Sequence, residues 1–187
     1  MFFIYIWETF PSGRQQTTNE LPLRRENDFD MENKTLSINY TVYGSVDEML
    51  PQDRELVLAA IEAQKSSYAP YSKFNVGAAV RLDDGTIVKG SNQENAASPS
   101  GLCAERTAMF AAGAQYPEIP MVSIAIAGGP GGTLCEAPAT PCGACRQVMA
   151  EYQTIGGKPM SVIMAGSGSI WKFNKVEDVL PFIFDSL

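Results

Sequence analysis

From residue 74 onward, short β-type segments alternate with helix-forming segments. Alternate apolar residues and a turn at Asp84-Gly85 predict a β-hairpin over residues 74–92. Residues 102–115 and 142–152 predict helices, and the apolar run at 121–129 is typical of a buried parallel strand. Strands predicted at 160–167 and 169–174 complete the order strand, strand, helix, strand, helix, strand, strand. This order indicates an α/β fold with a mixed five-stranded sheet covered by helices.

Two more helices flank this pattern. Residues 52–64 follow Pro51, place Leu56, Ala60 and Ala63 on one helical face, and end before the turn at Pro70. Residues 176–182 predict a short closing helix.

The first 45 residues differ from the rest. They are rich in charged and amide side chains and show no sustained period of 2 or 3.6 before the short TLSINYTVY stretch at residues 35–43. We interpret residues 1–45 as a partly disordered N-terminal extension and residues 46–187 as the catalytic domain. A start of the natural protein at Met31 is a further hypothesis.

Composition narrows the function classes. A chain of 187 residues with 45% hydrophobic and 19% charged residues predicts one ordinary globular domain. The formal charge of -7 has the wrong sign for neutralising a phosphate backbone, so we expect no nucleic-acid partner. The opening apolar run has seven residues and is followed by Glu8, which argues against a membrane span and favours the cytoplasm.

The chain contains no histidine. Any transition-metal site must therefore use cysteine or carboxylate ligands, and Ser-His triads are excluded. Four cysteines could form two disulfides, but disulfide scaffolds are usually shorter and denser in cysteine. Reduced thiols are the expected state.

Two short segments, Cys103-Ala104-Glu105 and Pro141-Cys142-Gly143-Ala144-Cys145, stand at predicted helix starts. A helix N-terminus favours the thiolate, and residues three apart share a helical face, so Cys142 and Cys145 could bind one ion. With Cys103 as third ligand, the fourth position of a tetrahedral zinc would stay open for water, as in catalytic sites. Glu105 could reach that water.

The motifs also have other interpretations. A C-x-x-C pair by itself fits structural zinc, a redox dithiol or buried neutral cysteines. The late position of this pair in the chain disfavours the redox interpretation. A zinc site closed by Cys135 would indicate a non-catalytic interaction module, and Glu105 would then be a carboxylate that stabilises a helix start.

With these segments, the sequence resembles the homotetrameric zinc-dependent cytidine deaminases. Residues 68–80, 91–108, 141–149 and 179–184 are similar to the corresponding family segments, and the resemblance spans roughly residues 53–184. It implies a three-layer α/β sandwich, one Zn²⁺ per subunit and a homotetramer. The implied reaction is deamination of cytidine and 2'-deoxycytidine in pyrimidine salvage. The alternative substrate is another aminated nucleoside or a cytidine-like antibiotic.

The resemblance also implies roles for individual residues. Phe74 would stack on the pyrimidine, Ala104 would offer its backbone to the base, and Asn92 and Glu94 would bind the ribose hydroxyls. Glu105 would be the proton shuttle.

Outside these contacts, the resemblance implies that Arg106 donates to the ligand thiolates and that Phe184 reaches a neighbouring subunit's site. Ser98 stands where many relatives have an aromatic residue, which puts a ribose or inter-subunit contact in doubt. Cys135 matches no ligand position.

Overall fold

The computed structural model describes residues 31–185. Residues 1–30, which hold most of the predicted extension, lie outside this part, as do residues 186–187. The chain divides into two units between Leu36 and Ser37, and every element below belongs to the second.

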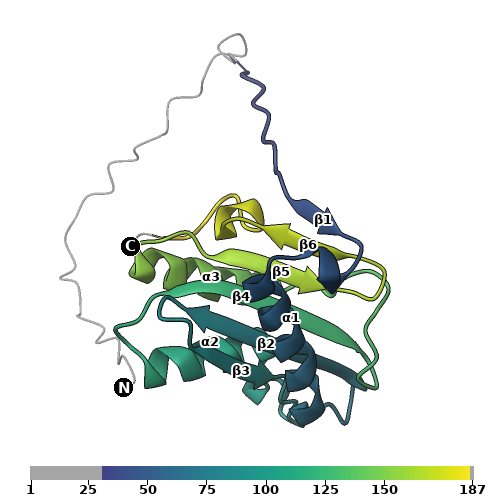
Figure 1. The fold of residues 1–187 in the computed structure, drawn as a ribbon. Coiled ribbons are helices and arrows are strands. Elements are labelled where there is room, and N and C mark those ends of the chain that lie inside the picture. The colour runs from purple at the N-terminus through teal and green to yellow at the C-terminus, as the bar shows by residue number, and fades with distance from the viewer. Residues whose placement is uncertain (1–30, 186–187) are drawn as a thin grey trace, which may run out of the picture. The chain divides into compact units, whose positions relative to one another are not determined.

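Within residues 37–185, the chain forms one mixed sheet and three α-helices (Figure 1). In chain order the elements are β1 (Thr41–Tyr43), α1 (Pro51–Ala63), β2 (Phe74–Leu82), β3 (Ile87–Ser91), α2 (Ala104–Gln115), β4 (Met121–Pro130), α3 (Gly143–Gly156), β5 (Ser161–Ala165) and β6 (Ile170–Phe173). The strand order in the sheet is β1-β6-β5-β4-β2-β3, with β4 and β5 parallel and the other neighbours antiparallel. No helix in the described part combines the length and apolar character needed to cross a membrane.

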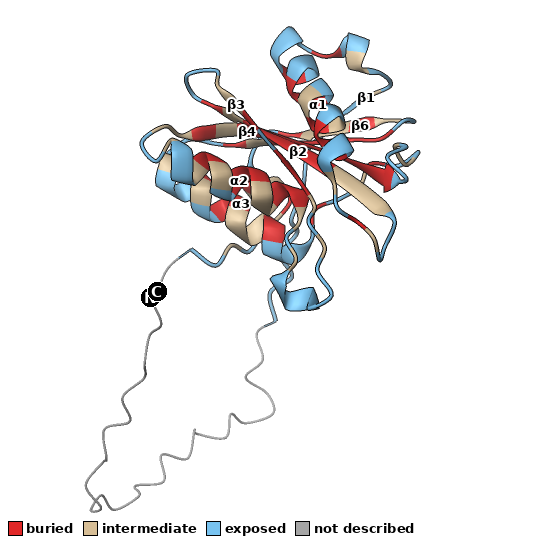
Figure 2. Cartoon of the chain, turned by 90° about the horizontal axis from the view of Figure 1, so that it is seen from below, coloured by how far each residue is buried: buried red, intermediate tan, exposed pale blue. Residues whose placement is uncertain are grey.

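The helices cover both faces of the sheet, with α1 on one side and α2 and α3 on the other (Figure 2). Because side chains alternate along a strand, each central strand contributes to two cores. In β2, Val80 and Leu82 pack beneath α2 and α3, whereas Ala79 packs beneath α1. The predicted apolar face of α1 is confirmed, since Leu56, Ala60 and Ala63 are all buried.

The predicted mixed sheet covered by helices is confirmed. The hairpin joins β2 to β3 through Asp84-Gly85, where Gly85 has a φ of 92° that favours glycine. The apolar run at 121–129 is the buried strand β4, and its parallel neighbour is β5.

The predicted number of strands was wrong, because the described sheet has six strands rather than five. The additional strand is β1, which lies in the stretch interpreted as extension and pairs antiparallel with β6 at Thr41↔Lys172 and Tyr43↔Ile170. Without β1, one side of β6 would expose unpaired backbone groups at the sheet edge. A strand of three residues is too short to show a recognisable alternation of apolar and polar side chains in the sequence.

The closing helix predicted at residues 176–182 is also shorter than expected. The structure has a single 3₁₀ turn at Val176–Asp178. Pro181 lacks a backbone N–H and disfavours helical geometry at Leu180, so the turn does not continue.

Gly90 of β3 lies directly against α2. A Cβ at this position would stand 2.4 Å from the backbone nitrogen of Ala108 and 2.8 Å from the carbonyl oxygen of Ala104. We therefore expect Gly90→Ala to push α2 from the sheet and to lower the free energy of unfolding by about 1–3 kcal/mol. Chemical denaturation measures this loss. Gly143→Ala is the control, because a Cβ there has nothing within 4 Å. Equal stability of the two variants would contradict the close packing of α2.

Candidate metal and substrate site

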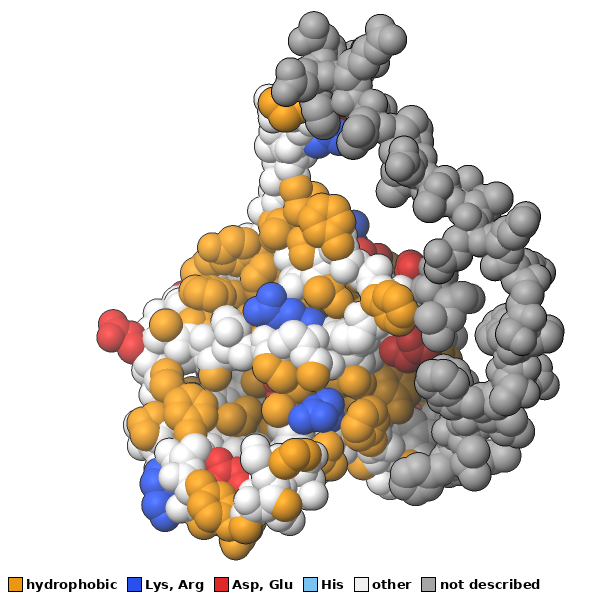
Figure 3. All heavy atoms as spheres, turned by 180° about the vertical axis from the view of Figure 1, so that it is seen from behind, with side chains coloured by type: hydrophobic (Ala, Val, Ile, Leu, Met, Phe, Trp, Pro, Cys, Tyr) orange, Lys and Arg blue, Asp and Glu red, His pale blue; other side chains and the backbone are white. Residues whose placement is uncertain are grey.

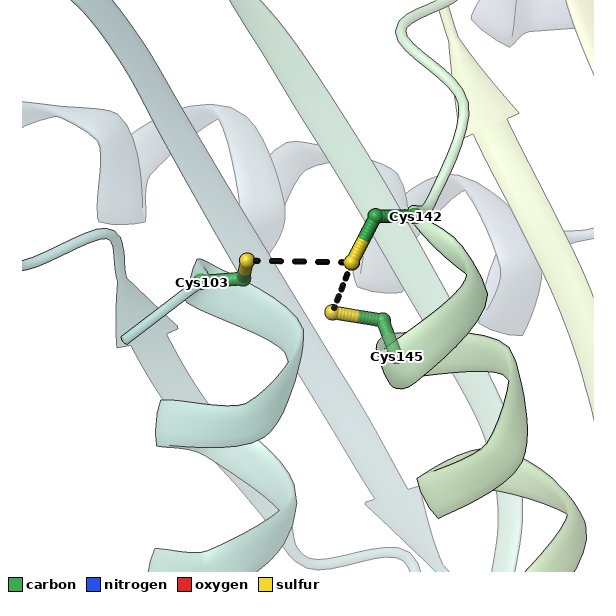
Figure 4. A group of neighbouring side chains, drawn as sticks. All are labelled: Cys103, Cys142 and Cys145. Atoms are coloured by element: carbon green, nitrogen blue, oxygen red, sulfur yellow. Dashed lines mark hydrogen bonds between the residues drawn. The ribbon is translucent and has the colours of Figure 1, made fainter. Parts of the chain in front are cut away.

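The starts of α2 and α3 bring the three predicted ligands together (Figure 4). Cys103 is the N-cap residue of α2 and Cys142 that of α3, both with extended backbone geometry, and Cys145 follows in the first turn of α3. All three sulfurs therefore lie where helix N-termini present partial positive charge, which stabilises thiolates.

The spacing of the sulfurs fits a tetrahedral metal. The Sγ atoms of Cys142 and Cys145 are 3.5 Å apart, those of Cys103 and Cys142 are 4.0 Å apart, and all three lie within 4.8 Å of one another. Zinc–sulfur bonds of about 2.3 Å give tetrahedral edges of about 3.8 Å. A set of three thiols at this spacing suits zinc in both geometry and donor chemistry.

Electrostatics favour one thiolate before any metal binds. A thiol hydrogen bond from Cys145, together with the Arg106 guanidinium, lowers the pKa of Cys103 to about 5. The same interaction with Cys103, together with burial, raises the pKa of Cys145. Arg106 Nη2 stands 3.6 Å from Cys103 Sγ and donates to it, while its Nε is buried and has no hydrogen-bond partner among residues 31–185. Arg106 thus directs its positive charge at the thiolate group.

Glu105 is buried beside the thiols, with 4% of its surface exposed. Burial raises the pKa of its carboxyl group above the usual value. A carboxyl group whose pKa is raised can both accept and release a proton closer to neutral pH.

A cavity of about 190 Å³ joins this carboxyl group to the predicted base-binding residues. Phe74, Asn92 and Ala104 line it together with Cys103, Glu105 and Cys142. The first residue of β2, the end of β3 and the starts of two helices thus meet at one end of the sheet. The remaining lining residues are Val76, Ile126, Ala139 and Thr140.

Asn92 is largely engaged within the protein. Its Oδ1 accepts hydrogen bonds from the Val76 N–H at 2.8 Å and the Ser67 hydroxyl at 2.5 Å, and its Nδ2 donates to the Phe74 carbonyl at 2.9 Å. The second Nδ2 hydrogen has no acceptor within the part of the chain that the structure describes. Asn92 also lines a second, wider hollow of about 460 Å³, so it stands where the two cavities meet.

Glu94 lines the wider hollow and is not a lining residue of the smaller one. Its Oε2 accepts from the backbone N–H groups of Tyr71 and Ser72, at 2.9 and 3.2 Å. Hydrogen bonds from Ser72 and Tyr71 lower the pKa of this carboxyl group, so it is a carboxylate at neutral pH. Ser98, the departure from the family pattern, lines the same hollow.

Phe184 and Cys135 lie apart from this group. Phe184 lines neither cavity and is 63% exposed, and its carbonyl accepts from Gln147 Nε2 at 2.6 Å. Cys135 is not part of the three-thiol group formed by Cys103, Cys142 and Cys145. Its backbone N–H donates a hydrogen bond to the Gly128 carbonyl, and its carbonyl accepts one from the Ser167 N–H.

Sequence reasoning missed the neighbours that shape the site. Ala139 and Thr140 precede the Pro141-Cys142 segment and line the cavity, but nothing in their residue types indicates this. Ser67 was missed as well, because its contact with Asn92 spans 25 residues of sequence.

Comparison with known proteins decides the family. Residues 50–156 match the family model of the cytidine and deoxycytidylate deaminase zinc-binding region. This span covers more than half of the chain and contains the three-thiol group. The chain belongs to the cytidine deaminase family. The predicted family and the zinc-binding deaminase domain are thereby confirmed.

Individual family members agree with this assignment. The chain is 44% identical over 100 residues to the cytidine deaminase of Halalkalibacterium halodurans, covering 53% of this chain and 71% of that one. It is 43% identical over 98 residues to that of Sporosarcina psychrophila, covering 52% and 68%. Its sequence is 39% identical to that of the cytidine deaminase from Burkholderia pseudomallei, and comparison with the crystal structure of that protein gives a TM-score of 0.61. The match covers 70% of this chain and 97% of that one.

Proposed function

We propose that this chain hydrolyses the exocyclic amine of cytidine and 2'-deoxycytidine, giving uridine and 2'-deoxyuridine with release of ammonia. The observation that carries the proposal is one cavity where the thiols of Cys103 and Cys142 meet the buried carboxyl group of Glu105 and the ring of Phe74. The third thiol, that of Cys145, lies within 4.8 Å of the other two. The family members named above are cytidine deaminases, which supports the same reaction.

Cys103, Cys142 and Cys145 would hold a zinc ion, which would lower the pKa of a water molecule toward neutrality and so provide the nucleophile. Arg106 moderates the excess negative charge of three thiolates by donating to Cys103 Sγ. Without that cation, the thiolates would weaken the acidity that activates the water.

Glu105 is the proposed proton carrier. It accepts a proton from the attacking water, whose oxygen bonds C4, and delivers that proton to ring N3 of the pyrimidine. It then carries the second proton, from the hydroxyl group now on C4, to the amine, and the C4–N bond breaks to release ammonia. Its burial excludes bulk solvent from these transfers. The second transfer is needed because an amine leaves readily only after it is protonated. The same carboxyl group can perform it, because it is free again once it has protonated N3.

Phe74 and Ala104 are proposed to bind the base. The ring of Phe74 offers an aromatic face to a flat pyrimidine, and the backbone of Ala104 lies between the ligand Cys103 and the acid Glu105. This placement would set the reacting carbon beside both chemical groups.

Asn92 and Glu94 are proposed to bind the sugar as a complementary pair. Asn92 has one N–H left to donate, and the carboxylate of Glu94 can only accept. A hydroxyl group can satisfy both at once, because it accepts from one partner and donates to the other. One sugar hydroxyl is enough for this arrangement, which supports both cytidine and 2'-deoxycytidine as substrates.

We propose residues 46–187 as the catalytic domain, working in pyrimidine salvage in the cytoplasm. Three closely spaced free thiols need a reducing compartment to stay available to a metal, which favours that location. The family-model match at 50–156 lies within the proposed domain.

A homotetramer is the proposed active unit. The face over α2 and α3 carries several hydrophobic patches with charged side chains scattered between them (Figure 3). Phe110 of α2 and Ile155 of α3 are exposed large apolar side chains, as is Phe184 near the end of the chain. Large apolar patches rimmed by polar residues mark protein–protein association surfaces, which supports an oligomer.

Phe184 tests the proposed assembly. If it reaches a neighbouring subunit's site, Phe184→Ala should raise the KM for cytidine by about tenfold, because a buried aromatic contact at an interface is lost. Phe182→Ala, which removes a ring that is 88% exposed, is the matched control. Light scattering reports the oligomer in both variants. A fully active monomer would refute the role.

The direct test of the function is an ultraviolet assay. Loss of the exocyclic amine changes the absorbance of cytidine, and zinc content is measured on the same sample. Other aminated nucleosides and a cytidine-like antibiotic complete the substrate panel. If a zinc-loaded protein did not turn over cytidine, the proposal would be overturned. Faster turnover of a different nucleoside would show that this nucleoside, and not cytidine, is the preferred substrate.

A further inference from the structure

We propose that Ser67 is a positioning residue for the sugar, acting through the side chain of Asn92. This inference rests on the proposed function, in which the last free N–H of Asn92 meets a sugar hydroxyl. It assigns a role to a residue that lines neither cavity and that no sequence motif singles out.

The backbone holds Ser67 beside Asn92. Ser67 follows the 3₁₀ turn Gln64–Ser66, with extended geometry at φ -65° and ψ 133°. The next residue, Tyr68, donates its N–H to the Asn92 carbonyl at 3.0 Å, and its own carbonyl accepts from the Glu94 N–H at 2.8 Å. Ser67 is therefore fixed next to the segment that carries both proposed sugar ligands.

Ser67 completes the set of hydrogen bonds that orients the Asn92 amide. Two of the three bonds, to the Val76 N–H and the Phe74 carbonyl, come from the backbone of β2. The third, from the Ser67 hydroxyl, comes from a different segment of the chain. The Val76 N–H can only donate and therefore meets Oδ1, whereas the Phe74 carbonyl can only accept and therefore meets Nδ2. Partners on two sides hold the amide plane against rotation, so that the remaining N–H keeps one direction.

The same network connects the sugar and base subsites. Asn92 donates to the carbonyl of Phe74, the residue proposed to stack on the pyrimidine. Loss of the Ser67 hydroxyl would leave Asn92 Oδ1 with one donor instead of two, and the amide would then swing more freely about its Cβ–Cγ bond. The expected consequence is weaker binding of substrates that have a sugar hydroxyl, with little effect on the chemical step.

The experiment compares two substrates in the zinc-loaded enzyme. Ser67→Ala should raise the KM for cytidine by about three- to tenfold, as expected for one hydrogen bond, with kcat within about twofold of wild type. The kcat/KM for 2',3'-dideoxycytidine should stay within about twofold, because that nucleoside has no 2' or 3' hydroxyl to lose a contact. Zinc content should remain unchanged.

Two further variants complete the test. Ser67→Thr keeps a hydroxyl and should restore most of the affinity for cytidine. Ser66→Ala is the matched control, since Ser66 is exposed and contributes its backbone carbonyl to Gln93 Nε2.

The outcomes separate this inference from the proposed function. Equal losses for both nucleosides would indicate a general structural role and overturn the inference, as would an unchanged KM for cytidine. A wild-type enzyme that is inactive on cytidine would overturn the proposed function and the inference with it.

Discussion

Replacing Glu105 by glutamine is expected to lower kcat for cytidine by about 10⁴-fold, which is the upper end of the range of about 10²- to 10⁴-fold for general acid–base catalysis. The loss should be large because one carboxyl group is proposed to carry both protons of the reaction. Glutamine has nearly the same shape and sits in the same buried place, but it cannot accept and release a proton.

Zinc content separates a chemical effect from a structural one. Glu105→Gln should keep about one zinc per chain, since the three thiols are untouched. Glu151→Gln, an exposed carboxylate on α3, is the matched control and should keep full turnover. If Glu105→Gln retained near wild-type kcat, the role assigned to Glu105 would be wrong.

Replacing Cys142 by alanine is expected to abolish zinc binding, from about one ion per chain to nearly none. Cys142 is the exposed member of the thiol group, whereas Cys145 is fully buried. Alanine at position 142 therefore removes a ligand with little loss of core packing. Because metal binding contributes to folding, the midpoint of thermal unfolding should also fall, by about 10 °C.

Cys135→Ala is the control for this experiment. Cys135 lies outside the three-thiol group, so its loss should leave zinc content and activity at wild-type levels. Loss of zinc in both variants would instead support a site closed by four cysteines, which is the non-catalytic alternative. Metal analysis of the two purified variants decides between these outcomes.

The arrangement of secondary structure could be predicted because its signals are local. The alternation along β2, the Asp84-Gly85 turn and the Ala-rich helices each depend on residues close in sequence. The edge strand β1 could not be predicted, since its three residues become a strand only by pairing with β6, more than a hundred residues later. The closing helix is shorter than predicted, because Pro181 prevents the turn at Val176–Asp178 from continuing.

The residues of the candidate site likewise fall into those that local motifs predict and those whose contacts depend on distant parts of the chain. Cys103, Cys142 and Cys145 could be found from their motifs, and the spacing of Cys142 and Cys145 already predicted a shared helical face. How Asn92 is engaged could not be found, because its three partners come from residues 67, 74 and 76. A sequence indicates that an amide is present but not how many of its hydrogen bonds the fold has already used.

The sequence by itself determined the chemistry: no histidine, three cysteines at helix starts, and one glutamate two residues after the first of them. Those residue types restrict the metal and the proton carrier, since ligand softness and acidity belong to side chains wherever they stand. Only the tertiary structure decided that the sulfurs stand 3.5 and 4.0 Å apart, that Glu105 is buried beside them, and that Ser67 holds Asn92. Distance and burial depend on packing between segments far apart in the chain, and local sequence patterns do not encode that packing.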